Sequence, residues 1–225
     1  MMAKISKFSA PTTISNNLSE VLERQIIFGE FAPGTRLTEE NLVKKFNVSR
    51  SPVREALRVL EQDGLITMVS RQGAKVPAIS VHDLDEVYMC RIPLEALAAK
   101  QAAMNRTEDD IGQMEDAVQN LCNILPQNDP RGFFEANVLF TNALHHSTHQ
   151  SKLVRLLSSI DKQALRYRYI AYLRSPALME KSVDFSIEIV NAIIKKRPRH
   201  AKSLTEDVLE NSWNNVRNEI EKLAV

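Results

Sequence analysis

The sequence predicts a mainly α-helical protein, with an N-terminal unit of short helices and a small β-hairpin, and a C-terminal six-helix antiparallel bundle. Three observations predict this fold. Apolar residues recur at helical spacing through most of the chain. Glycine is scarce, with 6 in the chain and only Gly112 and Gly132 after Gly73. Two β-prone runs, residues 65–69 and 74–76, flank a turn that contains glycine.

Length and composition indicate a globular protein. The chain has 225 residues, enough for one domain or two, and is 44% hydrophobic and 25% charged. The net charge is only +1, but residues 1–77 hold 11 Lys and Arg against 8 Asp and Glu, while the remainder holds 18 against 20. A mildly basic N-terminal part fits nucleic-acid binding, although this excess alone is weak evidence.

Signal peptides and membrane spans are not expected. The first residues lack the continuous apolar segment of a secretory signal, and no run of about 18 apolar residues is present to span a membrane. We therefore expect a cytoplasmic protein with no membrane partner. The two cysteines, Cys90 and Cys122, lie in helical apolar settings and are expected to be small buried residues, with no disulfide needed.

The helical pattern divides the chain into four segments. Residues 1–13 are expected to form a flexible arm, residues 14–77 the N-terminal domain, residues 78–81 a linker and residues 82–225 the bundle. The six helices of the bundle are expected at 82–104, 107–125, 130–148, 150–174, 178–196 and 199–223.

Residues 48–60 (VSRSPVREALRVL) form the segment around which the N-terminal domain is built. The apolar face of this helix consists of Val53, Ala56, Leu57 and Leu60. Another face carries an arginine at every fourth position, Arg50, Arg54 and Arg58. Ser49 and Ser51 are good N-cap residues, and Pro52 is tolerated in a first turn. Spaced arginines alone more often form a solvated helix face. This helix tip, however, also offers N–H groups and hydroxyls that can bind phosphate, and guanidinium groups that can bind the acceptor pair of guanine.

A short helix directly upstream makes DNA binding the stronger interpretation. Residues 38–46 have helical spacing, with Thr38 as the expected N-cap and Leu42 and Val43 facing inward. Two short helices joined by a tight connection form a helix-turn-helix, whose second helix enters the major groove. The hairpin that follows, with its turn at residues 70–73, is expected to be the wing of a winged helix-turn-helix.

Residues 27–77 resemble the winged helix-turn-helix of GntR-type bacterial transcription regulators. The matching residues are Ile27, Gly29, Pro33-Gly34, Leu37, Leu42, Phe46, Val48 to Leu57, Leu60, Gly64-Leu65, Gly73 and Val76. The resemblance implies a homodimer bound to double-stranded DNA. The same follows physically, because one short helix reads only a few base pairs and two related by a two-fold axis read a palindromic operator.

The expected DNA contacts come from the helix tip and the wing. Arg50 and Arg54 are expected to contact bases. Contacts to the DNA backbone are expected from Arg36, Ser49, Ser51 and the wing with Gly73, and Arg71 and Gln72 at the wing tip could contact either the backbone or the minor groove. For Arg71, an ordinary exposed loop charge is an equally good interpretation. Some relatives place an Arg near the start of the upstream helix, but this chain has Glu39 and Glu40 there, so phosphate contacts from that helix are doubtful.

The C-terminal part resembles the FCD effector domain of one GntR branch. The matching residues are Asp83-Leu84, Val87, Arg91 to Ala96, Phe140, Leu144, Leu153, Ala192-Ile193 and Ala201. Many FCD domains hold a metal ion with one Asp and three His. The matching positions here are Asn137, Thr141, Ser186 and Val208, which are not normal transition-metal ligands, so no metal is expected. Exposed imidazoles at a helix end are the preferred interpretation of His145, His146 and His149.

A cavity in the bundle is expected to bind a small organic acid or an acyl-type effector. Asn137, Thr141 and Ser186 would give it a polar, uncharged lining. Arg91 could hold an effector carboxylate, although a salt bridge to Glu95 or to another carboxylate is the slightly stronger alternative. Lesser candidates are Arg166 and Arg168.

These features predict a DNA-binding transcription regulator whose operator affinity responds to an effector in the bundle. The chain contains no G-x-S-x-G, H-E-x-x-H, P-loop or dinucleotide fingerprint, so neither enzymatic activity nor a cofactor is expected. Two alternatives stay open. One is a metal-independent helical scaffold or interaction protein with weak DNA binding, and the less favoured one is a metal-dependent regulator with a non-standard His site.

Overall fold

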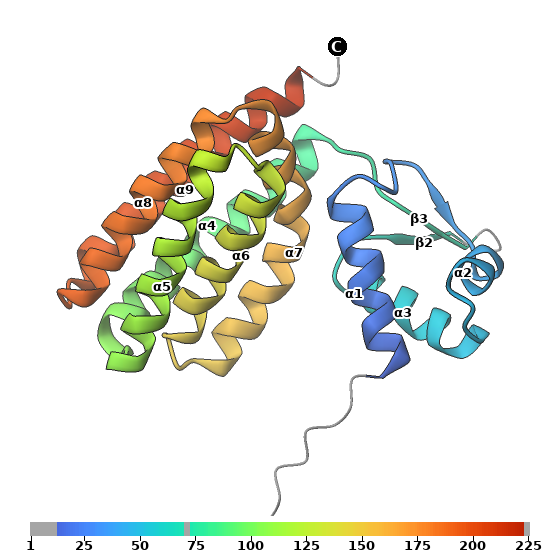
Figure 1. Cartoon of the computed structure of the whole chain (residues 1–225), viewed down its shortest axis with the longest axis horizontal. Helices are drawn as coiled ribbons and strands as arrows, with labels where there is room; N and C mark the ends of the chain where they lie inside the picture. Colours follow the sequence, from blue (N-terminus) through green and yellow to red (C-terminus); the bar gives the residue numbers. More distant parts are fainter. Residues whose placement is uncertain (1–12, 70–72, 223–225) are drawn as a thin grey trace, which may run out of the picture. The chain divides into compact units, whose positions relative to one another are not determined.

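Figure 1 shows the computed structural model of the chain, which describes residues 13–69 and 73–222. The chain forms two compact units, Met1–Pro77 and Ala78–Val225. The predicted arm lies outside the described residues except for Thr13. Arg71 and Gln72, at the predicted wing tip, also lie outside them.

The N-terminal unit contains the predicted helix-turn-helix. Its helices in the described residues are α1 (Ile14–Ile27), α2 (Glu39–Phe46) and α3 (Arg50–Gln62). The hydroxyl of Thr38 caps α2 by accepting a hydrogen bond from the N–H of Asn41 at 3.3 Å, as predicted. Asn47 makes the tight turn between α2 and α3 with a φ of 51°, a conformation that Asn adopts more readily than most residues.

One apolar core holds this unit together. The α3 side chains of the predicted stripe, Val53, Ala56, Leu57 and Leu60, are each at most 2% exposed. They pack with apolar residues of α1, which include Leu18, Leu22 and Ile26. Because the stripe is buried on one side, the arginine-bearing side of α3 is left to solvent.

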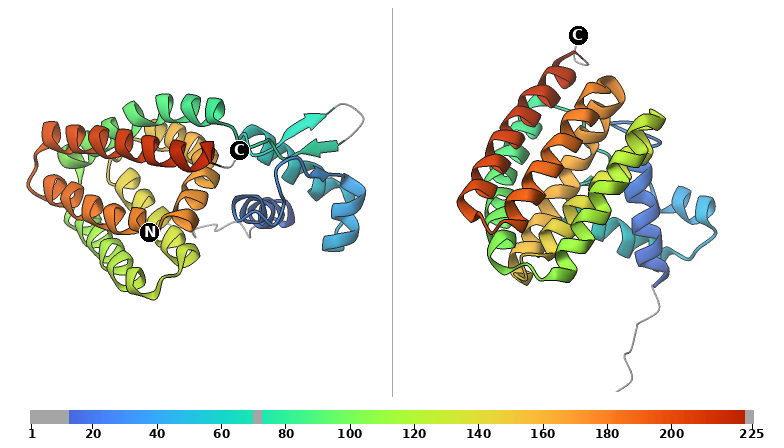
Figure 2. Two further views of the ribbon diagram at one scale, coloured as in Figure 1. Left: turned by 90° about the horizontal axis from the view of Figure 1, so that it is seen from above. Right: turned by 60° about the vertical axis from the view of Figure 1, so that its left-hand side comes forward.

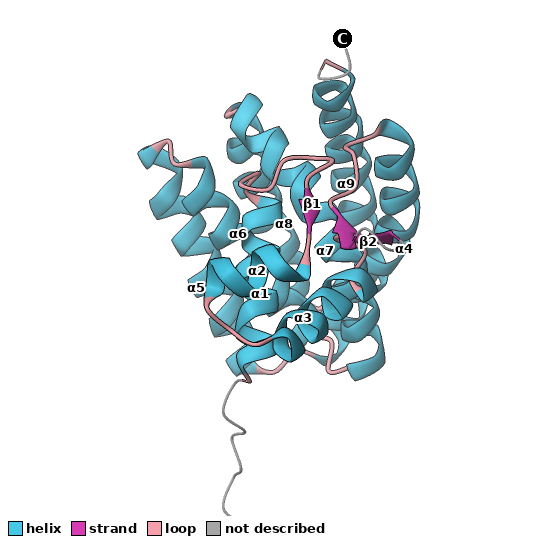
Figure 3. Ribbon diagram, turned by 90° about the vertical axis from the view of Figure 1, so that its right-hand side faces the viewer, coloured by secondary structure: helices cyan, strands magenta, loops and turns pink. Residues whose placement is uncertain are grey.

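A small antiparallel sheet completes the unit. Its strands are β1 (Arg36–Leu37), β2 (Thr67–Val69) and β3 (Gly73–Lys75), in the order β1-β3-β2. They are the magenta strands of Figure 3. The sequence predicts only the β2–β3 hairpin, because the two residues of β1 are too few to show an alternating pattern.

Gly73 is required by the backbone at the start of β3. Its φ is +83°, and a Cβ atom at this position would lie 2.8 Å from the backbone oxygen of Leu37. We expect Gly73→Ala to destabilise the N-terminal unit by roughly 1–3 kcal/mol, because the side chain adds both backbone strain and a clash with β1. Hydrogen exchange of residues 13–69, measured by mass spectrometry on the full chain, reports this loss as faster exchange.

Gly112→Ala is the matched control for this prediction. Gly112 lies inside a helix of the other unit, and no atom lies within 4 Å of the added Cβ. This substitution is expected to stabilise the helix by roughly 0.5–1 kcal/mol. Unchanged exchange in the Gly73→Ala protein would show that the strand tolerates a side chain there.

The C-terminal unit is the predicted six-helix bundle. Its α-helices in the described residues are α4 (Val81–Asn105), α5 (Glu108–Ile124), α6 (Pro130–His146), α7 (Ser151–Arg174), α8 (Ala177–Ile194) and α9 (Pro198–Glu221). A short 3-10 turn, η1 (Leu125–Gln127), precedes α6. Short connections make consecutive helices antiparallel, and the right-hand view of Figure 2 shows them side by side. The start of α4 is fixed by Ser80, whose hydroxyl accepts a hydrogen bond from the N–H of Asp83 at 3.1 Å.

Aromatic contacts join the helices of the bundle. Tyr88 of α4 stacks on Trp213 of α9 with ring centroids 6.3 Å apart, and Phe133 of α6 meets Tyr172 of α7 edge-on at 5.2 Å. No helix within residues 13–69 and 73–222 has the length and apolar character that a membrane span needs.

The expectation of two buried cysteines was wrong. Cys90 is exposed and Cys122 is half-buried. The buried face of α4 runs through Val87, Tyr88 and Arg91, so position 90 falls outside it. A locally apolar sequence setting did not reveal which side of the helix faces the core.

Candidate functional site

The start of α3 presents a cationic and polar surface to solvent. Ser49, Arg50, Ser51 and Arg54 are all exposed. Neither guanidinium is folded into the core that the other face of α3 forms. The predicted recognition helix therefore presents its arginines to solvent.

The N-terminus of α3 is open. Ser49 occupies the N-cap position with extended backbone angles, but within residues 13–69 its hydroxyl makes no capping hydrogen bond. Ser49 therefore occupies the predicted N-cap position, but in the described part of the chain it does not make the hydrogen bond expected of a capping serine. A helix N-terminus with uncapped N–H groups attracts anions such as phosphate.

Glu39 of α2 holds Arg54 in place. The Nε atom of Arg54 donates to both carboxylate oxygens of Glu39, at 2.8 and 2.9 Å. The Arg54 side chain remains 65% exposed. Such an exposed ion pair adds little stability, but it restricts the directions in which the guanidinium points. The sequence identified Glu39 only as an obstacle to phosphate contact, whereas the structure shows that it positions a predicted base-contacting arginine.

The remaining predicted DNA contacts belong to the small sheet. Arg36 is exposed in β1, opposite Lys75 of β3. Gly73 has the structural role given above, and Arg71 and Gln72 lie outside the described residues. The DNA contacts of all these residues stay predictions.

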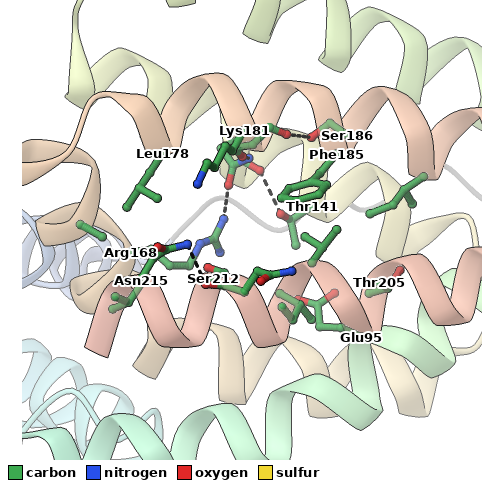
Figure 4. A pocket seen from close by; sticks show the side chains of 18 of the residues that line it. Glu95, Thr141, Arg168, Leu178, Lys181, Phe185, Ser186, Thr205, Ser212 and Asn215 are labelled. Carbon is green, nitrogen blue, oxygen red and sulfur yellow. Dashed lines mark hydrogen bonds between the residues drawn. The ribbon is translucent and has the colours of Figure 1, made fainter. Parts of the chain in front are cut away.

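A cavity of about 490 Å³ opens within the bundle, a volume typical of small-molecule sites. Residues of α4, α6, α7, α8 and α9 line it, and none of α5 does. The predicted effector residues Arg91, Asn137, Thr141 and Ser186 all line this one cavity. Figure 4 shows Thr141 and Ser186 among its side chains. The structure therefore brings the four residues together, while effector binding by them stays a prediction.

The positions that match the family's metal ligands also meet in this cavity, but they do not fit a transition metal. The Oδ1 atom of Asn137 accepts a hydrogen bond from Nη2 of Arg168. The hydroxyl of Thr141 donates to the carbonyl oxygen of Asn137 at 3.0 Å, and that of Ser186 donates to the carbonyl oxygen of Ser182 at 2.8 Å. Val208 offers no ligand atom. Two neutral hydroxyls and an amide bonded to a guanidinium form no normal ligand set.

We expect the full-length protein, after dialysis against metal-free buffer, to retain far less than one transition-metal ion per chain. Elemental analysis by plasma mass spectrometry measures this ratio. A retained ion at about one per chain would contradict both the chemistry of these cavity side chains and the sequence prediction.

Four charged or titratable side chains form a buried network beside the cavity: Arg91, Glu95, His145 and Asp161. Nε of Arg91 donates to Oδ1 of Asp161 at 2.9 Å, and Nη2 donates to Oε1 of Glu95 at 3.0 Å. Nε2 of His145 lies 2.7 Å from Oε2 of Glu95. All four residues are at most 8% exposed. Arg91 thus forms the internal salt bridge given as the stronger alternative, and as an effector anchor it becomes a weaker candidate.

The expectation of exposed imidazoles was wrong for His145. This residue is 3% exposed, because the last turn of α6 faces the bundle interior. His149 follows the end of α6 with a φ of 53°, and its Nε2 lies 2.7 Å from Oδ2 of Asp110. Glu95, His145 and Asp161 bring ligand atoms within 4.8 Å of one another, but the Arg91 cation already bonds both carboxylates.

The network shifts the pKa values of its members. Burial lowers the pKa of His145, but the charge of Glu95 and its hydrogen bond raise it more, so the net shift is upward. Burial raises the pKa of Glu95, yet His145 and Arg91 bring it well below the usual range. Burial and the charge of Glu95 together raise the pKa of Asp161.

The free energy of unfolding of the bundle should fall as the pH rises from about 6.5 through the raised pKa of His145. A raised pKa in the folded state means that the protonated imidazole stabilises the fold below the unfolded pKa, and this contribution is lost above the folded pKa. Its size is about 1.4 kcal/mol for each factor of ten by which the folded state binds the proton more tightly than the unfolded state. Urea denaturation at several pH values measures the effect, because Trp213 is the only tryptophan of the chain and lies in the bundle.

The variant His145→Gln should remove this part of the pH dependence, since the amide keeps a hydrogen-bonding nitrogen but does not titrate. His146→Gln is the matched control, because His146 is the exposed neighbour on the same helix. Equal pH profiles of the wild type and His145→Gln would show that the imidazole does not change its charge on unfolding.

Sequence reasoning gave the Arg91–Glu95 pair of α4 as an alternative, but it missed His145 and Asp161 as its partners because they come from two other helices, α6 and α7. One signal was available. Along α7, Asp161 and Arg168 fall in register with an apolar stripe of buried residues, Leu153, Leu157, Ala164, Leu165, Ala171 and Tyr172, while Arg166, Tyr167 and Tyr169 are buried outside that stripe. Two charged residues at apolar positions of a helical pattern indicate buried partners, so Asp161 and Arg168 could have been identified from spacing alone.

Comparison with known families agrees with both units. Residues 14–76 match the family described as bacterial regulatory proteins, gntR family, and residues 86–211 match the FCD domain. The FCD match covers more than half of the chain, 126 of 225 residues.

Curated relatives include the "Uncharacterized HTH-type transcriptional regulator YdhC" of Bacillus subtilis (strain 168), 29% identical over 169 residues, or 75% of this chain and 67% of that protein. The "HTH-type transcriptional regulator McbR" of Escherichia coli (strain K12) is 28% identical over 166 residues, or 72% of this chain and 74% of that protein. The solved structure of E. coli McbR/YncC superimposes with a TM-score of 0.81 at 21% identity, covering 92% of this chain and 99% of that one. This last likeness shows the fold.

Proposed function

This chain belongs to the GntR family of bacterial regulatory proteins, in the branch with an FCD domain, and from that premise we propose that it is a transcription regulator whose operator affinity is set by a small molecule bound in the bundle. The regulators with which it shares sequence support the DNA-binding role. The observation that carries the proposal is the joint presence of an exposed arginine tip on α3 and a cavity in the bundle.

The α3 tip supports direct reading of DNA. Arg50 and Arg54 are exposed on one side of a helix whose other side is buried, and Glu39 holds Arg54 across the helix pair. A good bidentate contact to a base discriminates by roughly 1–3 kcal/mol, so one half-site is too weak to specify an operator in a genome. We therefore propose a homodimer on a palindromic operator, acting in the cytoplasm.

The cavity supports an effector of small-molecule size, of the organic-acid or acyl class. An effector that binds one arrangement of the dimer more tightly than another changes the affinity of the dimer for its operator. A coupling free energy of roughly 1–3 kcal/mol between the two sites is enough for a useful switch. The protein is proposed to have no catalytic role and no resident metal, because its sequence lacks the motifs of enzymes and its cavity lacks a normal ligand set.

Binding to the region upstream of its own gene tests the proposal. We expect the full-length protein to bind this DNA far more tightly than an equally long fragment from an unrelated coding region, as measured by fluorescence anisotropy at fixed salt. Equal affinity for the two fragments would instead favour the alternative, a helical interaction protein with weak DNA binding.

A further inference from the structure

We infer that the guanidinium of Arg168 takes the place of the family's metal ion and anchors the carboxylate of a monoanionic ligand in the bundle cavity. The inference rests on the proposed function, since it names the chemical class of the effector. It also moves the anchoring role from Arg91, whose side chain is committed to Glu95 and Asp161.

The first step of the argument is the position of Arg168. It extends from α7 into the cavity, where its Nη2 atom donates to Oδ1 of Asn137. Asn137 stands at the position that matches the acidic metal ligand of the family. A fixed positive charge therefore lies beside the same position at which relatives with a metal hold theirs.

The second step is an incomplete set of hydrogen bonds. Arg168 is only 6% exposed, and its Nη1 atom has no hydrogen-bond partner among the residues that the structure describes. A buried charged donor without a partner is costly, so native structures rarely contain one unless a water, an ion or a ligand completes it. Arg168 lines the cavity, whereas Nη1 itself has almost no accessible surface, so a ligand that bonds Nη1 requires a small shift of the side chains around the guanidinium.

The third step is the charge around the cavity. Glu95 and Asp161 bond Arg91, and Glu95 also bonds His145. Within residues 13–69 and 73–222, Arg168 forms no ion pair of its own with a carboxylate. The two buried carboxylates balance Arg91 and Arg168 in number, and Lys181, which also lines the cavity, adds one positive charge. A bound monoanion would neutralise it.

The remaining surface of the cavity limits the ligand. Figure 4 shows Arg168 in the cavity, with Lys181 of α8 and Ser212 of α9 on its two sides in that view. Phe140 and Leu144 add apolar surface from α6. The buried carboxylates Glu95 and Asp161 lie beside the cavity and repel a second negative charge, which favours a monoanion over phosphate. The ligand class is thus a carboxylic acid with a partly apolar body.

Matched acids and amides test this inference without knowledge of the natural ligand. The probes are butyrate, hexanoate and benzoate, each paired with its uncharged primary amide, together with inorganic phosphate. Thermal unfolding of the full-length protein, followed by Trp213 fluorescence, detects binding at probe concentrations up to about 10 mM, and calorimetry gives each Kd. At least one acid is expected to raise the melting temperature, while its amide and phosphate leave it unchanged.

Variants of α7 test the role of the guanidinium. Arg168→Gln should weaken binding of the acid at least tenfold, while Arg155→Gln should bind as the wild type does, because Arg155 is an exposed arginine on the same helix outside the cavity. Arg168→Lys keeps the charge but loses the planar fork, and it should bind the acid more weakly than the wild type while still rejecting the amide. If Arg168→Gln does not fold, Arg168→Lys tests the role of the guanidinium in its place.

Several outcomes would overturn the inference. They are equal binding of an acid and its amide, undiminished acid binding by Arg168→Gln, tighter binding of phosphate than of any acid, or no response to any probe. These assays contain no DNA, so their failure can be distinguished from a failure of the proposed DNA binding. An acid that binds through Arg168 to a protein that does not select its upstream DNA would uphold the anchor and refute the regulator.

Discussion

The variant Arg91→Met is expected to lower the free energy of unfolding of the bundle by about 3–5 kcal/mol near neutral pH. The side chain is 4% exposed and bonds Asp161 at 2.9 Å and Glu95 at 3.0 Å. Removing its charge takes away the cation that bonds both buried carboxylates, and methionine fills much of the volume without replacing either hydrogen bond. The loss is therefore electrostatic rather than one of packing.

Urea denaturation followed by Trp213 fluorescence measures the change in the bundle. The loss should shrink at acid pH, because burial already raises the pKa of Asp161 and a protonated carboxyl no longer requires the cation. The second variant Arg91→Met/Asp161→Asn should recover part of the stability for the same reason.

Lys202→Met is the control for this prediction. Lys202 pairs with Glu206 on α9 at 3.0 Å, but its side chain is 46% exposed, so its loss should cost less than about 1 kcal/mol. If Arg91→Met lowers the free energy of unfolding by no more than Lys202→Met does, the buried network contributes no more stability than an exposed ion pair.

Arg54→Ala is expected to weaken binding to the protein's operator by roughly 1–3 kcal/mol, which is about fivefold to 150-fold, and to relax its sequence preference. Arg54 is 65% exposed on α3, and the Glu39 carboxylate fixes its Nε. Loss of a base contact weakens the operator complex more than the complex with unrelated DNA, whereas loss of a phosphate contact weakens both alike.

Anisotropy titrations on operator and unrelated DNA, at two salt concentrations, separate these two cases. Arg58→Ala is the matched control, since Arg58 is exposed on the same helix one turn farther from the tip. We expect it to lower both affinities by a similar and smaller factor. An unchanged ratio of the two affinities in the Arg54→Ala protein would refute a base-reading role.

Much of the N-terminal unit could be predicted from local sequence. The apolar stripe of α3, the Thr38 cap and the hairpin around Gly73 depend on residues a few positions apart, so periodicity and turn chemistry reveal them. The bond between Arg54 and Glu39 was not predicted, because it joins two helices whose mutual rotation depends on packing.

The bundle shows more clearly which features local sequence predicts and which depend on the packing of distant helices. Helix limits followed from breaks in the apolar pattern, and the four cavity positions followed from a family resemblance. His145 was wrongly expected to be exposed, because its burial depends on which side of the last turn of α6 faces Glu95 of α4. The pairing of Arg91 stayed open between a ligand and an internal carboxylate until Asp161 of α7 was placed beside it.

The sequence by itself determined the order of the helices and the arginine-bearing tip of α3, because each depends on residue type and spacing along one element. The residue types at the four positions that the family resemblance matches to metal ligands could also be read from the sequence. Only the tertiary structure decided that Arg91, Glu95, His145 and Asp161 neutralise one another and that Nη1 of Arg168 is left without a partner among the described residues. Charges interact through space with a strength set by distance and burial, and both arise only when distant helices pack.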